Sequence, residues 1–359
     1  MALVWQHAQG EQALQPIVAI AAGGTSFLRA DGNVWAFTDP NHLTGPVRVP
    51  GLKDIVQIAG GDSATAYALR RDGSVWSWTA QCRSPEEDET VCRYGQVRQI
   101  SGLANVIQLA TGRAFVIALK RDGTVWGWGD NTVGQLGDMA EMLKIGLSQR
   151  GALEKDHAIT VLTPIQIPIL KDIVKISADL DHAIALDKAG QPWTWGCNAS
   201  GLFTVGTLGE GEFVSQAGVG VIKLTSLPPS SDVAAGSSRM AVVGRDGKIR
   251  AWGVYRDGVV QYGDMKAEEV TGANKPQRIV AGDGAVFWIG DGFAWQQGPG
   301  MFGYDKDDPG KAMKVGVDTP ITEISPGAFK VSALTANGQI WSWGNGFGYA
   351  SRPTLVLEK

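Results

Sequence analysis

The sequence is poor in the side chains that most often carry catalysis or bind metals. Its 359 residues include only 4 His and 3 Cys, and the His lie far apart, at positions 7, 42, 157 and 182. Zinc sites and nucleophilic active sites need such residues clustered at set spacings. We therefore expect no metal, no cofactor and no catalytic residues.

The chain also lacks an excess of positive charge. It has 36 Asp and Glu against 32 Lys and Arg, so its formal net charge is −4. A general nucleic-acid binder needs a basic surface that displaces counterions from phosphate. A nucleic-acid partner is therefore not expected.

Long apolar runs, export signals and enzyme motifs are missing as well. The longest apolar runs, such as residues 16–22, are far shorter than the ~20 residues that cross a bilayer. Residues 1–30 contain no basic region followed by an apolar one, so no export signal is expected. The stretch GPGMFG (298–303) lacks the strand-and-helix context of a dinucleotide site, and the acidic stretch DKDDPG (305–310) has Gly316 where a calcium loop needs Glu. We expect neither an enzyme nor a membrane protein.

What the sequence has in abundance is Gly and Trp, with 48 and 13 residues. Both recur in one pattern that is repeated seven times along the chain. The repeats occupy residues 17–37, 55–78, 106–128, 173–195, 232–252, 278–297 and 321–343. A repeat spacing of about 50 residues is typical of stacked or ring-shaped repeat architectures.

Each repeat is interpreted as a series of short strands. In the second repeat, IVQIAGG and ATAYALRR predict two strands, Asp72-Gly73 predicts a two-residue type I′ hairpin, and SVWSW predicts a third strand. A fourth strand contains Pro, as in TPIQIP (163–168). Trp76 and Trp78 lie two residues apart, so they share one face of the third strand, and we expect such pairs to pack between neighbouring sheets.

The repeats therefore predict an all-β fold, a single seven-bladed β-propeller of four-stranded antiparallel blades. Residues 2–6 are a candidate for an extra closing strand. The expected repeat units are about 17–50, 51–105, 106–170, 171–230, 231–276, 277–319 and 320–359.

One stretch, LKRDGTVWGWGDNTVGQLG (119–137), carries a more specific pattern. It resembles the repeat of the regulator of chromosome condensation family, in which Trp-Gly is followed by the Asn–Gly–Gln–Leu–Gly motif. Here that motif is complete only once, at Asn131, Gly134, Gln135, Leu136 and Gly137, and the His that follows a glycine pair in the family is present only as His182. The chain is thus similar to a divergent member of the family. The resemblance implies a propeller that binds other proteins.

Long variable stretches follow the predicted third strands, at residues 79–96, 129–163, 196–220, 253–275 and 296–315. In an up-and-down blade these connections share one face of the ring, and loops longer than about 12–15 residues are usually functional or disordered. We predict that this face binds a partner protein. The candidate contact residues are Arg83, Glu86, Glu87, Asp88, Tyr94, Met139, Met142, Leu143, Phe203, Phe213, Tyr255, Tyr262, Met301, Phe302 and Tyr304.

Two of these stretches have further features. Apolar spacing in residues 138–158 fits a short amphipathic helix, or equally a loop folded back on the ring. Cys82 and Cys92 flank an acidic stretch and are either bridged, which would indicate a secreted or periplasmic protein, or two thiols, which would indicate a cytoplasmic one. Cys197 is expected to be a semi-buried thiol.

The sequence thus predicts a non-enzymatic scaffold, monomeric on its own, that engages a partner protein as an inhibitor, immunity or effector protein. The alternative that the resemblance implies is guanine-nucleotide exchange on a small GTPase. That activity requires a wedge, for which the insertion at residues 138–163 is the candidate.

Overall fold

The structure is a computed structural model of the whole chain. It describes residues 15–21, 25–37, 45–60, 65–83, 91–94, 96–137, 159–197, 218–237, 239–253, 267–273, 275–282, 284–298, 312–327, 330–344 and 353–358. For residues 80–83, 91–94 and 218–219 it describes the backbone alone.

Twenty-nine strands form seven antiparallel sheets, which we number as blades in chain order. Blade 1 contains β1 (Ile17–Ala21), β2 (Ser26–Arg29), β3 (Val34–Ala36) and β4 (Val47–Arg48). Blade 2 contains β5 (Ile55–Gly60), β6 (Thr65–Arg70), β7 (Val75–Arg83), β8 (Val91–Tyr94) and β9 (Arg98–Gln99). Blade 3 contains β10 (Val106–Thr111), β11 (Phe115–Lys120), β12 (Val125–Asp130) and β13 (Thr160–Gln166). Blade 4 contains β14 (Ile173–Asp179), β15 (His182–Asp187), β16 (Pro192–Cys197) and β17 (Gly218–Lys223).

The remaining three blades repeat this order. Blade 5 contains β18 (Ser230–Ala235), β19 (Arg239–Gly244), β20 (Ile249–Gly253) and β21 (Glu268–Glu269). Blade 6 contains β22 (Pro276–Ala281), β23 (Val286–Gly290), β24 (Phe293–Gln297) and β25 (Met313–Lys314). Blade 7 contains β26 (Ile321–Pro326), β27 (Lys330–Thr335), β28 (Ile340–Gly344) and β29 (Thr354–Leu357).

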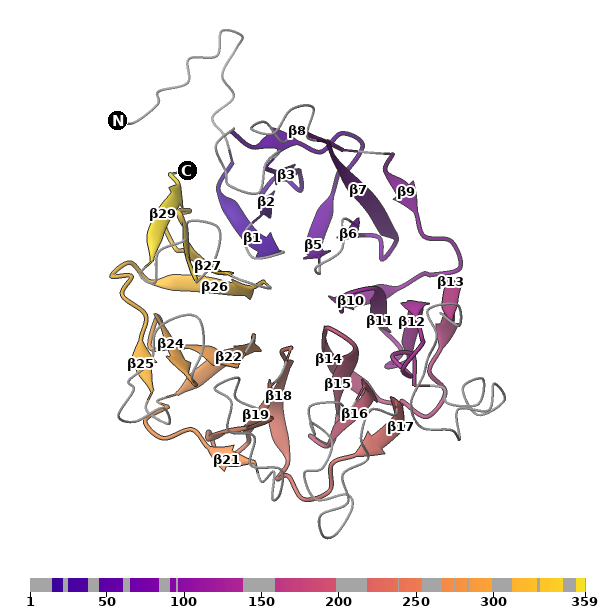
Figure 1. Cartoon of the computed structure of the whole chain (residues 1–359), viewed down its shortest axis with the longest axis vertical. Coiled ribbons are helices and arrows are strands. Elements are labelled where there is room, and N and C mark those ends of the chain that lie inside the picture. Colours follow the sequence, from indigo (N-terminus) through magenta and orange to yellow (C-terminus); the bar gives the residue numbers. More distant parts are fainter. Residues whose placement is uncertain are drawn as a thin grey trace, which may run out of the picture.

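Figure 1 shows the blades side by side in a ring, with the first strand of each blade innermost and the last at the rim. The predicted all-β, seven-bladed propeller is confirmed. Within the described ranges there is no helix, and accordingly none that could span a membrane.

The Asp-Gly turns between second and third strands differ from the prediction. In blade 2 the Arg70 amide donates to the Ser74 carbonyl at 2.9 Å and Gly73 has a φ of 82°, whereas Asp72 has no positive φ. This is a three-residue loop that ends in a left-handed glycine, not a type I′ turn, which needs two positive φ values. The Asp72 carboxylate instead accepts the Ser74 amide at 2.9 Å and stabilises the turn. Among the described turns between second and third strands, the type I′ pattern is found at Asp291-Gly292, where both φ values are positive.

The core is divided into seven apolar clusters, one for each pair of neighbouring blades. Six of them contain a buried Trp. These are Trp78, Trp128, Trp195, Trp252, Trp288 and Trp343. The expected packing of Trp between sheets is therefore confirmed for the second Trp of each pair, and in blade 6, where Gln297 takes that position, Trp288 from the second strand fills the interface instead.

The first Trp of each pair has a different role, which the sequence did not distinguish. Trp76 is only partly buried, and the Arg70 guanidinium lies 4.3 Å from its ring centroid. In blade 3 the Lys120 ammonium lies 5.1 Å from the Trp126 ring centroid. These rings therefore bind cations near the Asp-Gly turns, a contact worth about 0.5–1 kcal/mol at exposed sites.

A polar belt of side chains connects the blades around the ring axis. It uses the third residue of each first strand. The seven positions are Ala19, Gln57, Gln108, Lys175, Asp232, Arg278 and Glu323. Because a first strand is the edge of its sheet, its outer amide and carbonyl groups have no strand to pair with. The belt supplies partners from the neighbouring blade.

Two glutamines make the most complete contacts of the belt. Gln108 donates its Nε2 to the Ile176 carbonyl at 2.9 Å and accepts the Ile176 amide at 3.0 Å, which joins blade 3 to blade 4. Gln57 makes the same pair of bonds to Leu109, at 2.8 and 2.9 Å, and joins blade 2 to blade 3. One glutamine side chain thus pairs with both the amide and the carbonyl of one residue at the edge of the next blade.

Charged residues continue the belt through blades 4 to 7. Lys175 forms an ion pair with Asp232, which accepts the Ile279 amide at 3.3 Å. Arg278 forms an ion pair with Glu323 at 3.1 Å. Burial raises the pKa of the Glu323 carboxyl group.

Ring closure occurs between blades 7 and 1. Glu323 accepts the Ile20 amide at 2.8 Å, and Phe27 and Phe37 of blade 1 pack in one apolar cluster with Leu334 and Ile340 of blade 7. All four strands of blade 7 come from residues 321–357, so no described strand is exchanged between the first and last blades. The candidate closing strand at residues 2–6 lies outside the described residues. The belt has one gap, at Ala19, which has no polar side chain to offer blade 2.

Candidate functional site: the loop face of the ring

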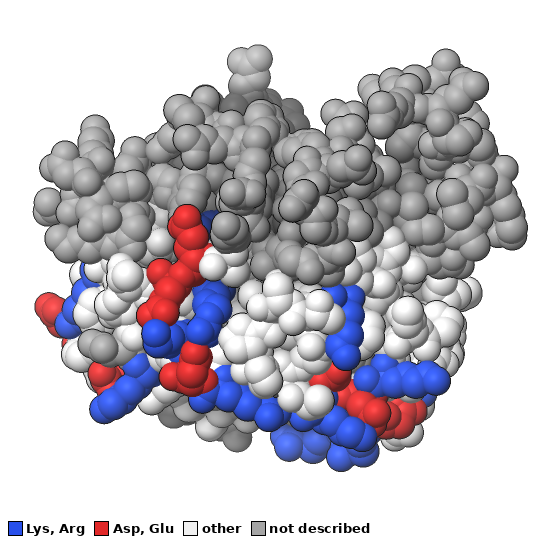
Figure 2. Space-filling view, turned by 90° about the horizontal axis from the view of Figure 1, so that it is seen from below, with Lys and Arg blue, Asp and Glu red and all other residues white. Residues whose placement is uncertain are grey.

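The antiparallel topology gives the ring two distinct faces. The third strand of each blade ends, and the fourth begins, on one side, which we call the loop face. The Asp-Gly turns and the links from each blade to the next lie on the other side, which we call the hairpin face. Figure 2, a side view, shows Lys, Arg, Asp and Glu together along the described surface at the hairpin face.

Most of the predicted contact residues lie outside the described residues. Only Arg83 and Tyr94 fall within strands, and there the backbone alone is described. The residues outside the described ranges are Glu86, Glu87, Asp88, Met139, Met142, Leu143, Phe203, Phe213, Tyr255, Tyr262, Met301, Phe302 and Tyr304. The predicted short helix within residues 138–158 also lies there.

The stretch 79–96 is corrected in part, because much of it forms strands rather than a loop. β7 runs to Arg83 and pairs with β8, and the register makes Cys82 and Cys92 Cα partners. Third strands can extend beyond the blade when a second strand is available to pair with them. The sequence signal for this was the alternation around the two Cys, which is weak over so few residues.

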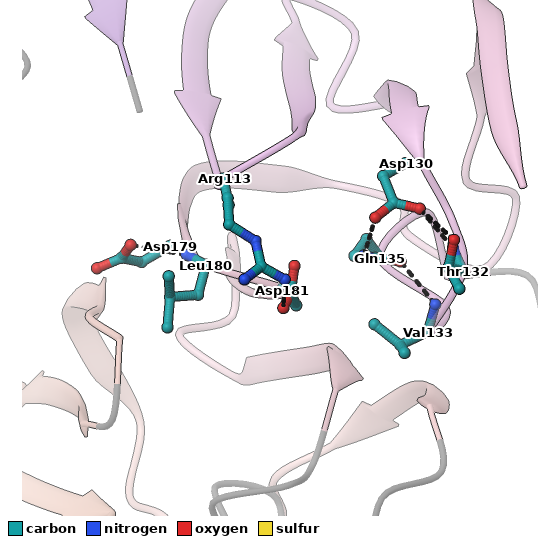
Figure 3. A network of polar contacts seen from close by, with 8 residues as sticks. All are labelled: Arg113, Asp130, Thr132, Val133, Gln135, Asp179, Leu180 and Asp181. Carbon is teal, nitrogen blue, oxygen red and sulfur yellow. Dashed lines mark hydrogen bonds and ion pairs between the residues drawn. The ribbon is translucent and has the colours of Figure 1, made fainter. Parts of the chain in front are cut away.

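The best described part of the loop face is the turn that follows β12 in blade 3 (Figure 3). The Asp130 carboxylate accepts the Thr132 amide at 2.8 Å, the Thr132 hydroxyl at 2.5 Å and the Gln135 Nε2 at 3.2 Å. Gln135 in turn accepts the Val133 amide at 2.9 Å. The polar atoms of this turn are directed at one another, so the turn is a rigid support rather than a ligand site.

The same turn packs into the interface between blades 3 and 4. Asn131 accepts the Leu136 amide at 2.9 Å, and the Leu136 side chain is buried. The Gln135 carbonyl accepts the Trp195 indole N–H at 2.8 Å. Gly137 has a φ of 75°, and a Cβ there would lie 2.9 Å from Ile167. The Asn–Gly–Gln–Leu–Gly motif is therefore explained by packing between blades.

An ion pair also joins these two blades at the loop face. Arg113, in the turn between β10 and β11, contacts Asp181 at 2.6 Å, and its amide donates to the Leu180 carbonyl at 2.8 Å (Figure 3). The Arg113 side chain is 58% exposed and that of Asp181 is 19% exposed. Arg113 is thus a described cation on the inner part of the loop face that sequence reasoning did not identify, because it is one Arg in a short turn.

His182 lies beneath this ion pair and is structural. Its side chain is fully buried in β15, and Nε2–H donates to the Gly236 carbonyl at 2.9 Å, across to blade 5. A carbonyl oxygen can only accept, so this nitrogen carries the proton. Burial lowers the His182 pKa to about 4, and the ring is neutral at pH 7. Among the described residues, no group of three or more His, Cys, Asp or Glu is placed to hold a metal ion.

With the ring and its repeat motif established, the class of protein follows: the chain is a repeat-built, seven-bladed β-propeller. Models of the regulator of chromosome condensation (RCC1) repeat match residues 106–135 and 122–186, which correspond to blades 3 and 4. The propeller therefore carries RCC1-type repeats in blades 3 and 4.

Known proteins with similar sequences are larger. The chain is 28% identical over 199 residues to the human E3 ubiquitin-protein ligase HERC2, a match that covers 49% of this chain and 4% of that protein. It is 29% identical over 244 residues to the ultraviolet-B receptor UVR8 of Arabidopsis thaliana, covering 61% and 52%. It is 33% identical over 94 residues to the mouse regulator of chromosome condensation, covering 26% and 21%. The chain thus spans about half or less of the length of these relatives.

Solved structures agree on the fold. Prp20p from Saccharomyces cerevisiae, studied for binding to Gsp1p and histones, has a TM-score of 0.63 at 20% identity over 87% of this chain and 80% of that one. Human WBSCR16 has a TM-score of 0.65 at 17% identity over 87% and 85%. At this level of identity the likeness establishes the architecture.

Proposed function

We propose that this chain is a non-enzymatic scaffold that binds a partner protein through the loop face. The observation that carries the proposal is the charge of the segments that join strand ends on that face. They contain 19 Asp and Glu but 9 Lys and Arg. The segments are 22–25, 37–46, 61–64, 84–90, 112–114, 131–159, 180–181, 198–217, 236–238, 254–267, 282–285, 298–312, 327–329 and 345–353. A partner with a basic surface would complement them.

The rigidity of the ring supports the same proposal. Hydrogen bonds from Gln57, Gln108 and Glu323, together with seven apolar clusters, fix each blade against the next. The strand ends at the loop face are therefore held at constant separations. A surface on a rigid frame loses little conformational entropy when it binds.

The names of similar proteins are consistent with protein partners. Prp20p is described with Gsp1p and histones, and yeast RCC1 (Prp20) is described bound to Kap60. We propose that the partner of this chain is likewise a protein, and that it acts by occupying that partner. An inhibitor, immunity or effector role follows from such occupancy.

The test is a pull-down from the native source with the full chain and two variants. In the first variant, residues 138–158 are replaced by a short Gly-Ser linker. In the second, Glu86, Glu87 and Asp88 are changed to Gln, Gln and Asn. Both should lose most of the captured partner, while Asp31→Asn on the hairpin face, as a matched control, should keep it. Capture that is indifferent to both loop-face variants would contradict the proposal.

Guanine-nucleotide exchange, which the family resemblance implies, is tested with the same material. If the captured partner is a small GTPase, release of a fluorescent guanine nucleotide is measured with and without the chain. Release that depends on residues 138–158 would favour exchange over simple occupancy. No change in release would favour the scaffold.

A further inference from the structure

Every first strand contains a β-bulge at its second residue. In blade 2, for example, Ile55 pairs with Arg70 and Gln57 pairs with Leu69, so Val56 is the extra residue. The same shift of register occurs in all seven blades. The bulged residues are Val18, Val56, Ile107, Val174, Ser231, Gln277 and Thr322. Bulges often redirect a side chain at a functional position.

The chemistry of these seven residues is not evenly distributed. In blades 1 to 4 they are apolar and exposed, at 49% for Val18, 43% for Val56, 44% for Ile107 and 53% for Val174. We call these four residues the apolar crescent. In blades 5 to 7 the bulged residues are polar. The four account for half of the eight large exposed hydrophobic residues in the described part of the chain.

The four residues of the apolar crescent lie on neighbouring strands around the ring axis. The strands that carry it, β1, β5, β10 and β14, are innermost and contact each other in turn (Figure 1). Val56 follows Ile55, and the Ile55 amide donates at 3.2 Å to the carbonyl of Gly32 in the Asp-Gly turn of blade 1. The crescent therefore lies at the hairpin end of the ring. Scattered single hydrophobic residues need no explanation, but four at equivalent positions of adjacent blades do.

A basic residue lies beside the crescent in blades 2, 3 and 4. The backbone amide of Arg71 donates at 2.9 Å to the carbonyl of Asp54, which is two residues before Val56. The amide of Arg121 makes the equivalent bond to the carbonyl of Asn105, which is two residues before Ile107. Lys188 repeats this contact in blade 4. All three side chains are exposed. Ala30 and Ala336 take this position in blades 1 and 7, and Arg245 takes it in blade 5, where the bulged residue is the polar Ser231.

Most acidic groups near these cations are held by other donors. Asp72 accepts the Ser74 amide and hydroxyl, and Asp122 accepts the same groups of Thr124, which lowers the pKa of both carboxyl groups. Asp172 pairs with Lys188 at 2.6 Å. Asp54 is exposed. Within the described residues, Arg71 and Arg121 form no ion pair, so their guanidinium groups are available to an anionic partner.

We propose that the hairpin face of blades 1 to 4 binds an acidic segment of another protein that carries apolar side chains. The apolar side chains contact the crescent, and the carboxylates pair with Arg71 and Arg121. A nucleic acid would use the cations but not Val56, Ile107 and Val174, and the net charge of −4 opposes it. This surface is separate from the loop face.

The proposal is tested by fluorescence anisotropy with the full chain and a labelled peptide of alternating Leu and Glu. The double variant Ile107→Ser/Val174→Ser reproduces the chemistry of blade 5 and should weaken binding by about tenfold, because it removes two of the four apolar side chains of the crescent. Arg71→Gln/Arg121→Gln should weaken binding and reduce its dependence on salt. Gln277→Ser, on the polar side of the ring, is the matched control and should change binding less than twofold.

Three results would overturn the proposal. The first is no preference for this peptide over one with Lys in place of Glu. The second is unchanged binding in both double variants. If a Ser variant fails to fold, Val56→Thr takes its place, because Thr has nearly the same shape as Val. The third is competition by a single-stranded RNA that is equally strong before and after Ile107→Ser/Val174→Ser. Replacing residues 138–158 should leave peptide binding unchanged, so a failure here and a failure at the loop face are distinguishable.

Discussion

The polar belt predicts that one glutamine contributes measurably to the stability of the whole ring. Gln108→Ala removes two hydrogen bonds, the donation to the Ile176 carbonyl at 2.9 Å and the acceptance of the Ile176 amide at 3.0 Å. A hydrogen bond contributes about 1 kcal/mol net. Gln108 is half-buried, so water replaces part of the loss. We expect the free energy of unfolding to fall by about 1–2 kcal/mol.

The gap in the belt provides the converse experiment. In blade 1, Ala19 occupies the position that Gln108 has in blade 3. Ala19 pairs with Leu28 of the second strand, just as Gln108 pairs with Leu119. Ala19→Gln should bring an amide toward Ile58 of blade 2 and complete the belt. Ordering the longer side chain costs about 1–2 kcal/mol. The expected gain is therefore smaller, about 0.5 kcal/mol.

Chemical denaturation at constant pH measures both variants, and thermal unfolding gives a second reading. At an unfolding entropy of about 2 cal/mol/K per residue, a loss of 2 kcal/mol in a 359-residue cooperative unit lowers Tm by about 3 °C. Gln108→Glu keeps the acceptor and loses the donor, so it should fall between wild type and Gln108→Ala. If the free energies of unfolding of wild type and Gln108→Ala agree within about 0.3 kcal/mol, the reasoning is refuted. Water would then hydrogen-bond to the edge of the strand as well as Gln108 does.

Three further predictions concern pH, packing and redox state. The neutral, buried His182 has a pKa of about 4 in the fold against 6.5 when unfolded, so the free energy of unfolding should fall by about 2 kcal/mol from pH 7 to 5. A denaturation series should show this loss, and His182→Phe should flatten it. Gly129→Ala should cost about 2 kcal/mol or more, because φ is 103° and the new Cβ would meet Phe115 Cα at 2.8 Å. Gly102→Ala, with nothing within 4 Å, should cost about 1 kcal/mol. Finally, we expect oxidised glutathione to oxidise Cys82 and Cys92 to a disulfide, with two electrons passing to the glutathione. By mass, the unfolded chain should then take up one thiol label, and three labels after reduction. Three labels in both cases would exclude a bridge.

The architecture could be predicted because each of its determinants is local. Asp72-Gly73 marks a turn within four residues, and Trp76 and Trp78 mark the sheet face within three. The exact turn type was wrong because Asp-Gly suits two kinds of hairpin loop, and the register of the flanking strands decides between them.

The belt and the crescent could not be predicted in the same way. Gln57, Lys175 and Glu323 occupy one structural position, but they share no side-chain chemistry, so they form no motif in the sequence. What unites them is the peptide edge of the next blade, which appears only when the ring is assembled. In the sequence the bulged residues Val56 and Ile107 are part of ordinary β-branched strands, and only the change of register reveals that they are exposed.

The uninterrupted order of the sheets has a consequence for engineering. No described strand of blade 7 comes from the segment that forms blade 1. The packing of each blade against the next is therefore determined by side-chain contacts and does not depend on where the chain begins. New termini opened at Gly102, in an exposed link with open space around it, would leave all seven sheets intact once residues 15 and 358 were joined by a linker. Such a circular permutant could carry a reporter domain at a place chosen by the experimenter.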